Sequence, residues 1–246
     1  MKSEIYHTGL TPPRSVKIDG FEIFHYPVLK VDYESNNVPQ DIRDILKLDP
    51  IVLMMSKNAV LGLQQWISHF DLGSDFFSDT KIWTVGDRTH ACLKDILGIQ
   101  SYYPNEMTGT GVTKALKKQN HFRVLLISGY TLRQEFIDGL SLVGVNFFHF
   151  PVYKTTCVES IEFSTHFKNA ESNYLIITSP SGVDGIMKSL SLSDLSKMKN
   201  KIISIGPTTS AAIRQKCGDV FLESEVQNIK ALYDNLKDII LKSSYS

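Results

Sequence analysis

Short apolar runs alternate along the chain with stretches of helical periodicity. Each run is followed by a polar or glycine-rich turn and then by apolar residues on one helical face, as with Val60, Leu63, Ile67 and Phe70. Strands that alternate with helices predict an α/β fold of parallel sheets flanked by helices. A final helix is expected to open at Ser224, with Gln227 at the capping-box spacing. The predicted strands lie at residues 51–55, 81–85, 124–127, 174–178, 202–205 and 219–222.

The order of these segments is repeated at a spacing of 120 to 124 residues. Residues 54–60 align with 177–183, residues 84–93 with 204–213, and residues 21–30 with 145–154. Gly9 and Gly129 add a fourth pair in the same order. Four ordered landmarks at a nearly constant spacing predict two similar domains.

The positions of the domain boundaries follow from the pair Pro27 and Pro151, since each is followed by an extended stretch with charged residues. If both stretches are linkers, the chain leaves its first domain, builds a second one and returns. We therefore expect a discontinuous domain 1 of residues 1–29 and 154–246, and an inserted domain 2 of residues 30–153.

Composition narrows the class of protein. The 246 residues are 42% hydrophobic, enough for packed cores, and 26 basic residues balance 26 acidic ones. A chain of zero net charge is not expected to bind duplex nucleic acid. Three distant cysteines without ligand spacing predict no structural zinc. The polar N-terminus and the absence of an 18-residue apolar run predict a soluble, cytoplasmic protein without membrane segments.

The turns that follow the strands are the candidate binding sites. In open parallel sheets ligands bind beyond the carboxyl ends of the strands, where helix N-termini present free N–H groups to anions. Small or hydroxyl residues occupy every such turn, which favours a cleft for a ligand with many carboxylates or phosphates. Ordinary helix capping by the same residues is the alternative at each turn. The residues are Ser56, Asn58, Gly86, Thr89, Ser128, Gly129, Ser179, Ser181, Gly182, Gly206, Thr208 and Thr209.

Other sequence motifs say less about the function. Neither a P-loop nor a GxSxG motif is present in the sequence. The Gly-Thr-Gly of residues 109–111 follows no strand and is expected to be a plain loop. His25 and His149 occupy equivalent repeat positions, which favours a packing or hydrogen-bonding role. Tyr153 lies in the predicted return linker, and the equivalent position of the other repeat is Leu29, so the duplicated fold does not require a phenol there. We expect this phenol either to face a cleft or to be half-buried at an interface.

Five segments, in order, resemble the uroporphyrinogen-III synthase family. They read MSKNAV at 55–60, VGDRTHACL at 85–93, VYKT at 152–155, TSPSGV at 178–183 and IGPTTSAAI at 205–213. The resemblance implies two α/β domains joined by a two-stranded linker and a monomeric enzyme that uses neither cofactor nor metal. It also implies conversion of the linear tetrapyrrole hydroxymethylbilane to uroporphyrinogen III, with loss of water and inversion of ring D.

The resemblance also suggests roles for residues. Tyr153 would be the general acid at the leaving hydroxyl, because its phenol is protonated at neutral pH. The eight carboxylates of the substrate would be held by backbone amides and hydroxyls. The resemblance also suggests a transient contact with the preceding enzyme of the pathway. The substrate-binding residues would be Ser56, Asn58, Ala59 and Thr89 in one domain and Ser179, Ser181, Gly182, Thr208 and Thr209 in the other.

The sequence departs from the family at two places. The first strand is followed by too few residues for a full helix, and Arg14 is the only arginine near the usual arginine turn. Asp87 and Arg88 replace the small residues that are common at their turn. Two other interpretations therefore stay open: a non-catalytic two-lobed module that binds an anionic metabolite, and a degenerate or regulatory homologue.

Overall fold

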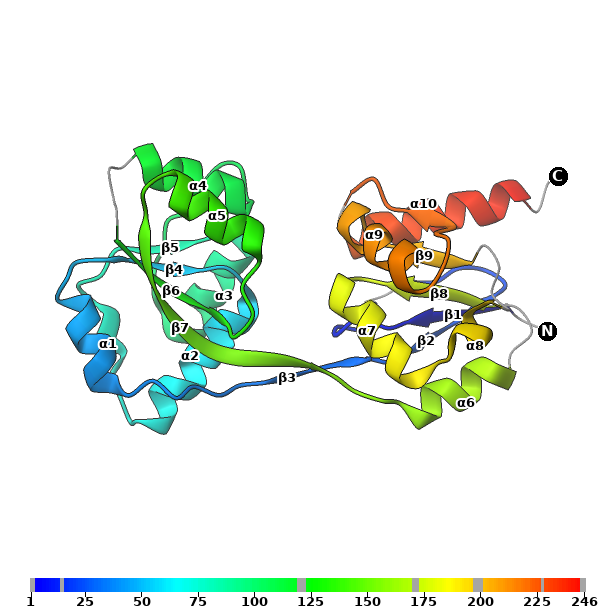
Figure 1. The fold of residues 1–246 in the computed structure, drawn as a ribbon, viewed down its shortest axis with the longest axis horizontal. Helices are drawn as coiled ribbons and strands as arrows, with labels where there is room; N and C mark the ends of the chain where they lie inside the picture. The colour runs from blue at the N-terminus through cyan, green and yellow to red at the C-terminus, as the bar shows by residue number, and fades with distance from the viewer. Residues whose placement is uncertain are drawn as a thin grey trace. The chain divides into compact units, whose positions relative to one another are not determined.

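The chain forms two compact α/β units in a computed structural model that describes residues 3–13, 16–118, 123–169, 173–196, 201–226 and 228–243. Unit 1 comprises Met1–Lys30 and Thr156–Ser246, and unit 2 comprises Val31–Thr155. The boundaries fall within two strands, β3 (Leu29–Asp32) and β7 (Asn146–Cys157). Each unit contains a sheet with helices on both faces (Figure 1), which confirms the predicted fold class.

In unit 1 the sheet has the strand order β10-β9-β8-β1-β2, and its described pairings are parallel. Phe163, Val183 and Ile213 bring helices α6, α7 and α9 onto one face. Leu232 and Leu236 of α10 pack on the other face. The strands are β1 (Ser3–His7), β2 (Phe21–His25), β8 (Asn173–Ile177), β9 (Ile202–Ser204) and β10 (Leu222–Glu223), and the helices are α6 (Ile161–Asn169), α7 (Pro180–Ser189), α8 (Leu192–Ser196), α9 (Pro207–Lys216) and α10 (Ile229–Ser243).

In unit 2 the strand order is β3-β7-β6-β4-β5. Helices α1, α2 and α3 cover one face through Ile42, Leu63 and Leu93. Helices α4 and α5 cover the other through Leu116 and Leu140. The remaining strands are β4 (Ile51–Met54), β5 (Ile82–Thr84) and β6 (Arg123–Gly129), and the helices are α1 (Pro39–Leu46), α2 (Lys57–His69), a 3₁₀ turn η1 (Ser74–Phe77), α3 (Asp87–Leu97), α4 (Gly109–Lys118) and α5 (Gln134–Leu142).

The sequence repeat is reproduced in the strand order and in individual hydrogen bonds. The run β9-β8-β1-β2 of unit 1 corresponds to β5-β4-β6-β7 of unit 2. His25 Nε2 lies 2.7 Å from the Gly9 carbonyl oxygen, and His149 Nε2 lies 3.0 Å from that of Gly129. The two histidines therefore have the hydrogen-bonding role that their equivalent positions predict.

A second matched contact joins a helix to the extended segment that follows each proline. Gly62 of α2 lies against Val152, and Gly185 of α7 lies against Val28, so closely that a Cβ on either glycine would stand 2.8 Å from the valine Cγ2. The valine carbonyl oxygen would be nearer still. The absence of a side chain at these two helical positions is therefore what lets the helix approach the strand.

The two units differ in the connection between their paired strands. In unit 2, helix α5 joins β6 to β7, whereas no helix lies in residues 8–13 and 16–20 between β1 and β2. This agrees with the shortened unit expected from the sequence. Arg14 lies outside the described residues.

Three local predictions are wrong. Helix α10 begins at Ile229 rather than at Ser224, because the Asn228 side chain accepts the Lys230 N–H at 2.8 Å; Gln227 lies outside the described residues. Strand β10 covers Leu222–Glu223 instead of 219–222. The Gly-Thr-Gly of 109–111 starts α4, since the Thr108 hydroxyl accepts the Gly111 N–H at 3.1 Å.

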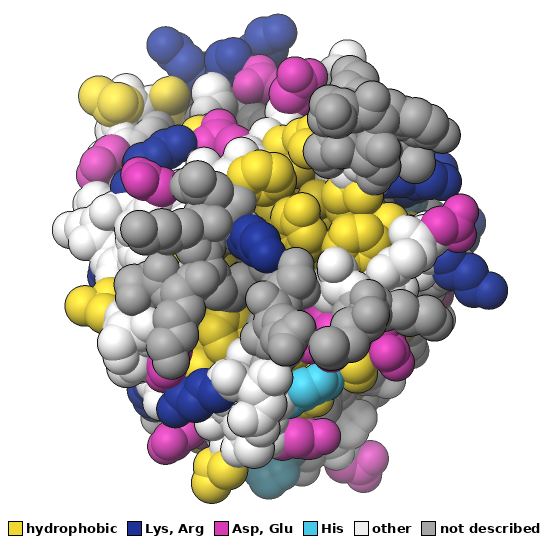
Figure 2. All heavy atoms as spheres, turned by 90° about the vertical axis from the view of Figure 1, so that its right-hand side faces the viewer, with side chains coloured by type: hydrophobic (Ala, Val, Ile, Leu, Met, Phe, Trp, Pro, Cys, Tyr) yellow, Lys and Arg dark blue, Asp and Glu magenta, His cyan; other side chains and the backbone are white. Residues whose placement is uncertain are grey.

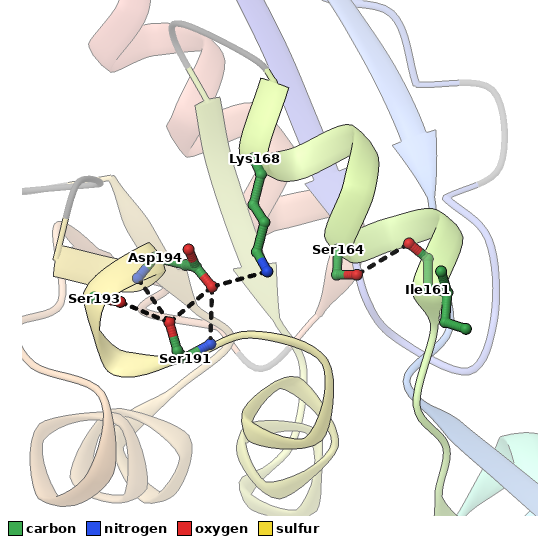
Figure 3. A network of polar contacts seen from close by, with 6 residues as sticks. All are labelled: Ile161, Ser164, Lys168, Ser191, Ser193 and Asp194. Atoms are coloured by element: carbon green, nitrogen blue, oxygen red, sulfur yellow. Dashed lines mark hydrogen bonds and ion pairs between the residues drawn. The ribbon is translucent and has the colours of Figure 1, made fainter.

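Helix α8 is short, and its start is stabilised by side-chain hydrogen bonds and an ion pair. Ser191 and Asp194 form a reciprocal cap in which the Asp194 carboxylate accepts the Ser191 N–H at 3.0 Å (Figure 3). Lys168 of α6 lies 3.4 Å from the same carboxylate. Hydrogen bonds from Ser191, with the nearby Lys168 cation, lower the pKa of Asp194. The contact ties α8 to α6.

The face drawn in Figure 2 carries side chains of both charges. Apolar side chains gather in its upper middle, acidic and basic ones are scattered around them, and several basic ones lie together at the top. Among the described residues, no helix is both long and apolar enough to span a membrane.

Candidate active site

Among the described elements of each unit, two helices begin three residues after the end of a strand. In unit 2, α2 follows β4 and α3 follows β5; in unit 1, α7 follows β8 and α9 follows β9. The first N–H groups of a helix have no carbonyl partner within it, and the helix dipole places partial positive charge there. Each unit thus presents two groups of amide donors at one edge of its sheet.

The α2 turn is built around Ser56. Its side-chain oxygen accepts the Ala59 N–H at 3.1 Å and so caps the helix. Capping of Ala59 leaves the amides of Lys57 and Asn58 available at the first turn. The Asn58 side chain is half-buried, and its Oδ1 accepts a hydrogen bond from the Tyr33 hydroxyl at 3.2 Å.

Tyr153 is brought to the same turn by an irregularity in the sheet. The register between β6 and β7 shifts at Ser128 and Gly129, so that Gly129 pairs with Tyr153. The ring lies over the Gly129 Cα, where an added Cβ would be 2.9 Å from Cζ. The Tyr153 hydroxyl is 3.2 Å from Ser56 Oγ. The phenol, half-buried, is therefore held between a glycine and a helix-capping serine.

The α7 turn of unit 1 repeats the cap. Ser179 Oγ accepts the Gly182 N–H at 3.1 Å and lies 3.2 Å from Ser181 Oγ. Ser181 is exposed. Ser179 and Ser181 correspond to Ser56 and Asn58 in the repeat, but the position of Tyr153 is taken by Leu29. The phenol is thus specific to unit 2.

The second turn in each unit starts with glycine. Gly86 and Gly206 are the N-cap residues of α3 and α9, and Thr89 and Thr209 each donate their N–H to the glycine carbonyl, at 3.2 and 3.1 Å. Both threonine side chains are nearly enclosed, at 5% and 3% exposure, whereas Thr208 is exposed. The exposed hydroxyl is therefore on Thr208.

The α3 turn also contains an anion of its own. The Asp87 carboxylate accepts the N–H of Arg88 at 2.6 Å. The corresponding residue of α9 is Pro207, which has neither an N–H nor a charge. An incoming carboxylate at α3 would face Asp87, and this distinguishes the α3 turn from the other three.

The sequence analysis missed two residues near these strand ends. Tyr33 of unit 2 contacts the predicted site residue Asn58 directly, and His7 of unit 1 is fully buried at the end of β1. Burial, with the neighbouring His25, lowers the pKa of His7 to about 4, so its ring is neutral at pH 7. The Tyr233 hydroxyl lies 3.2 Å from His7 Nδ1. No group of three or more potential metal ligands occurs among the described residues.

The fold and the site define a two-unit α/β protein in which matched helix N-termini lie at the carboxyl ends of the strands. A family model described as "Uroporphyrinogen-III synthase HemD" matches residues 14–234. The chain therefore belongs to the uroporphyrinogen-III synthase family. This confirms the resemblance seen in the sequence.

Individual relatives agree with the assignment. A "Porphyrin biosynthesis protein HemD" of Ruminiclostridium josui is 23% identical to this chain over 192 residues. The match covers 76% of this chain but only 38% of the relative, so the chain spans less than two-fifths of that protein's length. A uroporphyrinogen-III synthetase of Helicobacter pylori has a TM-score of 0.70 at 16% identity, covering 97% of this chain and all of that one. A mutant uroporphyrinogen III synthase of Thermus thermophilus has a TM-score of 0.61 at 13% sequence identity, and the match covers 98% of this chain and 99% of that one. At these identities the structural likeness concerns the fold.

Proposed function

We propose that this protein converts hydroxymethylbilane to uroporphyrinogen III, with loss of water and inversion of ring D. The observation that carries the proposal is the family match over residues 14–234, supported by the Tyr153–Ser56 pair and the matched helix starts. The uncatalysed ring closure gives the I isomer. The enzyme must therefore direct attack by the substituted carbon of ring D, which is a task of positioning.

Backbone amides would hold the substrate without a large positive charge. In the proposal, carboxylates bind at Ser56, Asn58 and Ala59 of unit 2, and at Ser179, Ser181 and Gly182 of unit 1. Thr89, Thr208 and Thr209 belong to the second turn of each unit. Helix N-termini bind anions through N–H groups and the dipole, which is how a chain of zero net charge could bind a polyanion.

Tyr153 would act as general acid. The hydroxymethyl C–O bond breaks as the electron-rich pyrrole forms an azafulvenium, and the phenol proton moves to the departing oxygen, which leaves as water. Ser56 Oγ already accepts the Ala59 N–H at 3.1 Å, so its own proton is free to be donated to the Tyr153 oxygen 3.2 Å away. That arrangement directs the phenol proton toward the substrate and stabilises the phenolate that remains.

The isomer of the product tests the proposal. Purified protein is mixed with hydroxymethylbilane, and the porphyrins obtained after oxidation are separated by chromatography. The proposal predicts a III-isomer fraction that rises with protein concentration. Formation of the I isomer alone at every concentration refutes it, and ligand binding without any change of isomer would favour a non-catalytic module for anionic metabolites.

The finer expectations are part of the same proposal. We expect a cytoplasmic monomer that needs no metal or cofactor and that can receive its unstable substrate from the enzyme that makes it. Sedimentation at micromolar concentration tests the monomer. Turnover after treatment with a chelator tests the independence from metal.

A further inference from the structure

Tyr33, which follows strand β3, contacts the α2 turn without belonging to any of the family-like segments. Its hydroxyl donates to Asn58 Oδ1 at 3.2 Å. Asn58 is the second residue of α2, next to the amide donors at the helix start. A phenol that donates to the amide oxygen leaves the Nδ2 hydrogens of Asn58 free to donate elsewhere.

We propose that Tyr33 is a positioning residue that orients the Asn58 side-chain amide so that Nδ2 donates to a carboxylate of the substrate. The inference rests on the proposed function, since it concerns the same binding turn. An unrestrained amide can present either its oxygen or its nitrogen, and the oxygen would repel a carboxylate. The Tyr33 hydrogen bond selects the attractive orientation before the substrate arrives.

The repeat supplies a comparison within the molecule. The residue equivalent to Tyr33 in unit 1 is Cys157, and the equivalent of Asn58 is Ser181. Cys157 Sγ lies 3.7 Å from the Ser181 carbonyl oxygen. The same position therefore contacts the second residue of the helix in both units, but only unit 2 has a side chain there that can orient an amide.

The surroundings of Tyr33 suit a hydrogen-bond donor. The side chain is half-buried and borders a surface hollow that Gly62 and Trp66 also line. Burial, with Tyr153 as a smaller contributor, raises the pKa of Tyr33, so the phenol keeps its proton at neutral pH. Replacement by phenylalanine would keep the ring and remove only the donor.

The test is a double-mutant cycle between Tyr33→Phe and Asn58→Ala, with Cys157→Ala as the matched control in unit 1. The KM for hydroxymethylbilane and the Kd for uroporphyrin III, the oxidised product with eight carboxylates, are measured for each variant. One hydrogen bond of ordinary strength corresponds to a change of about threefold to tenfold. We expect Tyr33→Phe to raise KM and Kd by that factor with kcat within about twofold of wild type, as for an interaction equal in ground and transition states.

The cycle separates positioning from a merely structural role. In the Asn58→Ala background, Tyr33→Phe should have no further effect on either constant, and Cys157→Ala should leave both unchanged. An unchanged KM and Kd in Tyr33→Phe, or an equal increase in the Asn58→Ala background, overturns the inference. A wild-type protein that forms no III isomer refutes the proposed function instead, and the Kd values for uroporphyrin III then decide the role of Tyr33. Failure of the wild type both to form the III isomer and to bind uroporphyrin III overturns both proposals.

Discussion

The two helical glycines that lie against an extended segment give a quantitative test of the duplicated packing. In Gly62→Ala the new Cβ would stand 2.8 Å from Val152 Cγ2, and in Gly185→Ala it would stand 2.8 Å from Val28 Cγ2. Carbon atoms in ordinary contact are about 3.5 Å apart. The helix must therefore move by about 0.7 Å, and by more to clear the valine carbonyl, which cannot rotate away.

The expected cost follows from two opposing effects. Overpacking of this kind costs about 3 kcal/mol at the upper end of its usual range. Alanine gains about 1 kcal/mol over glycine in a helix. The net loss of unfolding free energy is therefore about 2 kcal/mol for each variant. Gly139→Ala in α5 is the matched control, because its Cβ would meet Thr113 Cγ2 at an ordinary 3.4 Å, and it should stabilise by about 1 kcal/mol.

Urea unfolding measures these changes. Both tryptophans, Trp66 and Trp83, lie in Val31–Thr155, so their fluorescence follows unit 2, while circular dichroism follows the whole chain. Gly62→Ala should lower the fluorescence midpoint, and Gly185→Ala should lower a dichroism midpoint. If Gly62→Ala unfolds at or above the wild-type urea concentration while Gly139→Ala behaves as expected, the close approach of α2 to Val152 is wrong.

The remaining predictions concern the site and the response to acid. Tyr153→Phe should lower kcat roughly 10²-fold, the lower range for loss of a general acid, with an unfolding midpoint close to wild type; an unchanged rate removes Tyr153 from the chemistry. Ser56→Ala and Ser179→Ala should each cost about 1 kcal/mol of stability as lost helix caps, but Ser56→Ala should lower kcat more, because Ser56 also bonds Tyr153. The pKa of His7 is about 4 in the folded protein and about 6.5 in the unfolded chain, so the folded protein holds the neutral ring. The contribution of His7 to the unfolding free energy is therefore complete above pH 6.5 and is lost as the pH falls toward 4, a loss of about 3 kcal/mol. Unfolding midpoints at pH 7.5 and 4.5 check this, and an equally steep decline in His7→Gln would assign the effect to other groups.

The duplicated architecture was accessible from the sequence because its landmarks are residues with special backbone or capping roles. Gly9 and Gly129 each place a carbonyl oxygen within hydrogen-bonding distance of a matched histidine, and Ser56 and Ser179 each cap a helix. Extending the alignment of 54–60 with 177–183 by two residues would also have paired Gly62 with Gly185. Their close contacts could not be foreseen, since periodicity does not reveal which strand a helical glycine approaches.

The starts of two helices and the role of Tyr33 were harder to predict, because the local sequence allowed more than one structure. Ser224 and Asn228 are both suitable caps, and the choice of Asn228 is made by the geometry of its side chain with Lys230. The glycines at 109 and 111 suggested a loop, but Thr108 caps the helix that they begin. Tyr33 gave no signal, because its partner in the repeat is Cys157, a residue of different chemistry.

Binding of a polycarboxylate by helix N-termini is the central claim. The most direct measurement is a titration of ¹⁵N-labelled protein with uroporphyrin III, followed through the backbone amide resonances. The account predicts saturable shifts that are largest at residues 57–59 in unit 2 and at Ser181, Gly182 and Thr208 in unit 1. Shifts confined to amides away from these helix starts, or to one unit alone, would contradict it.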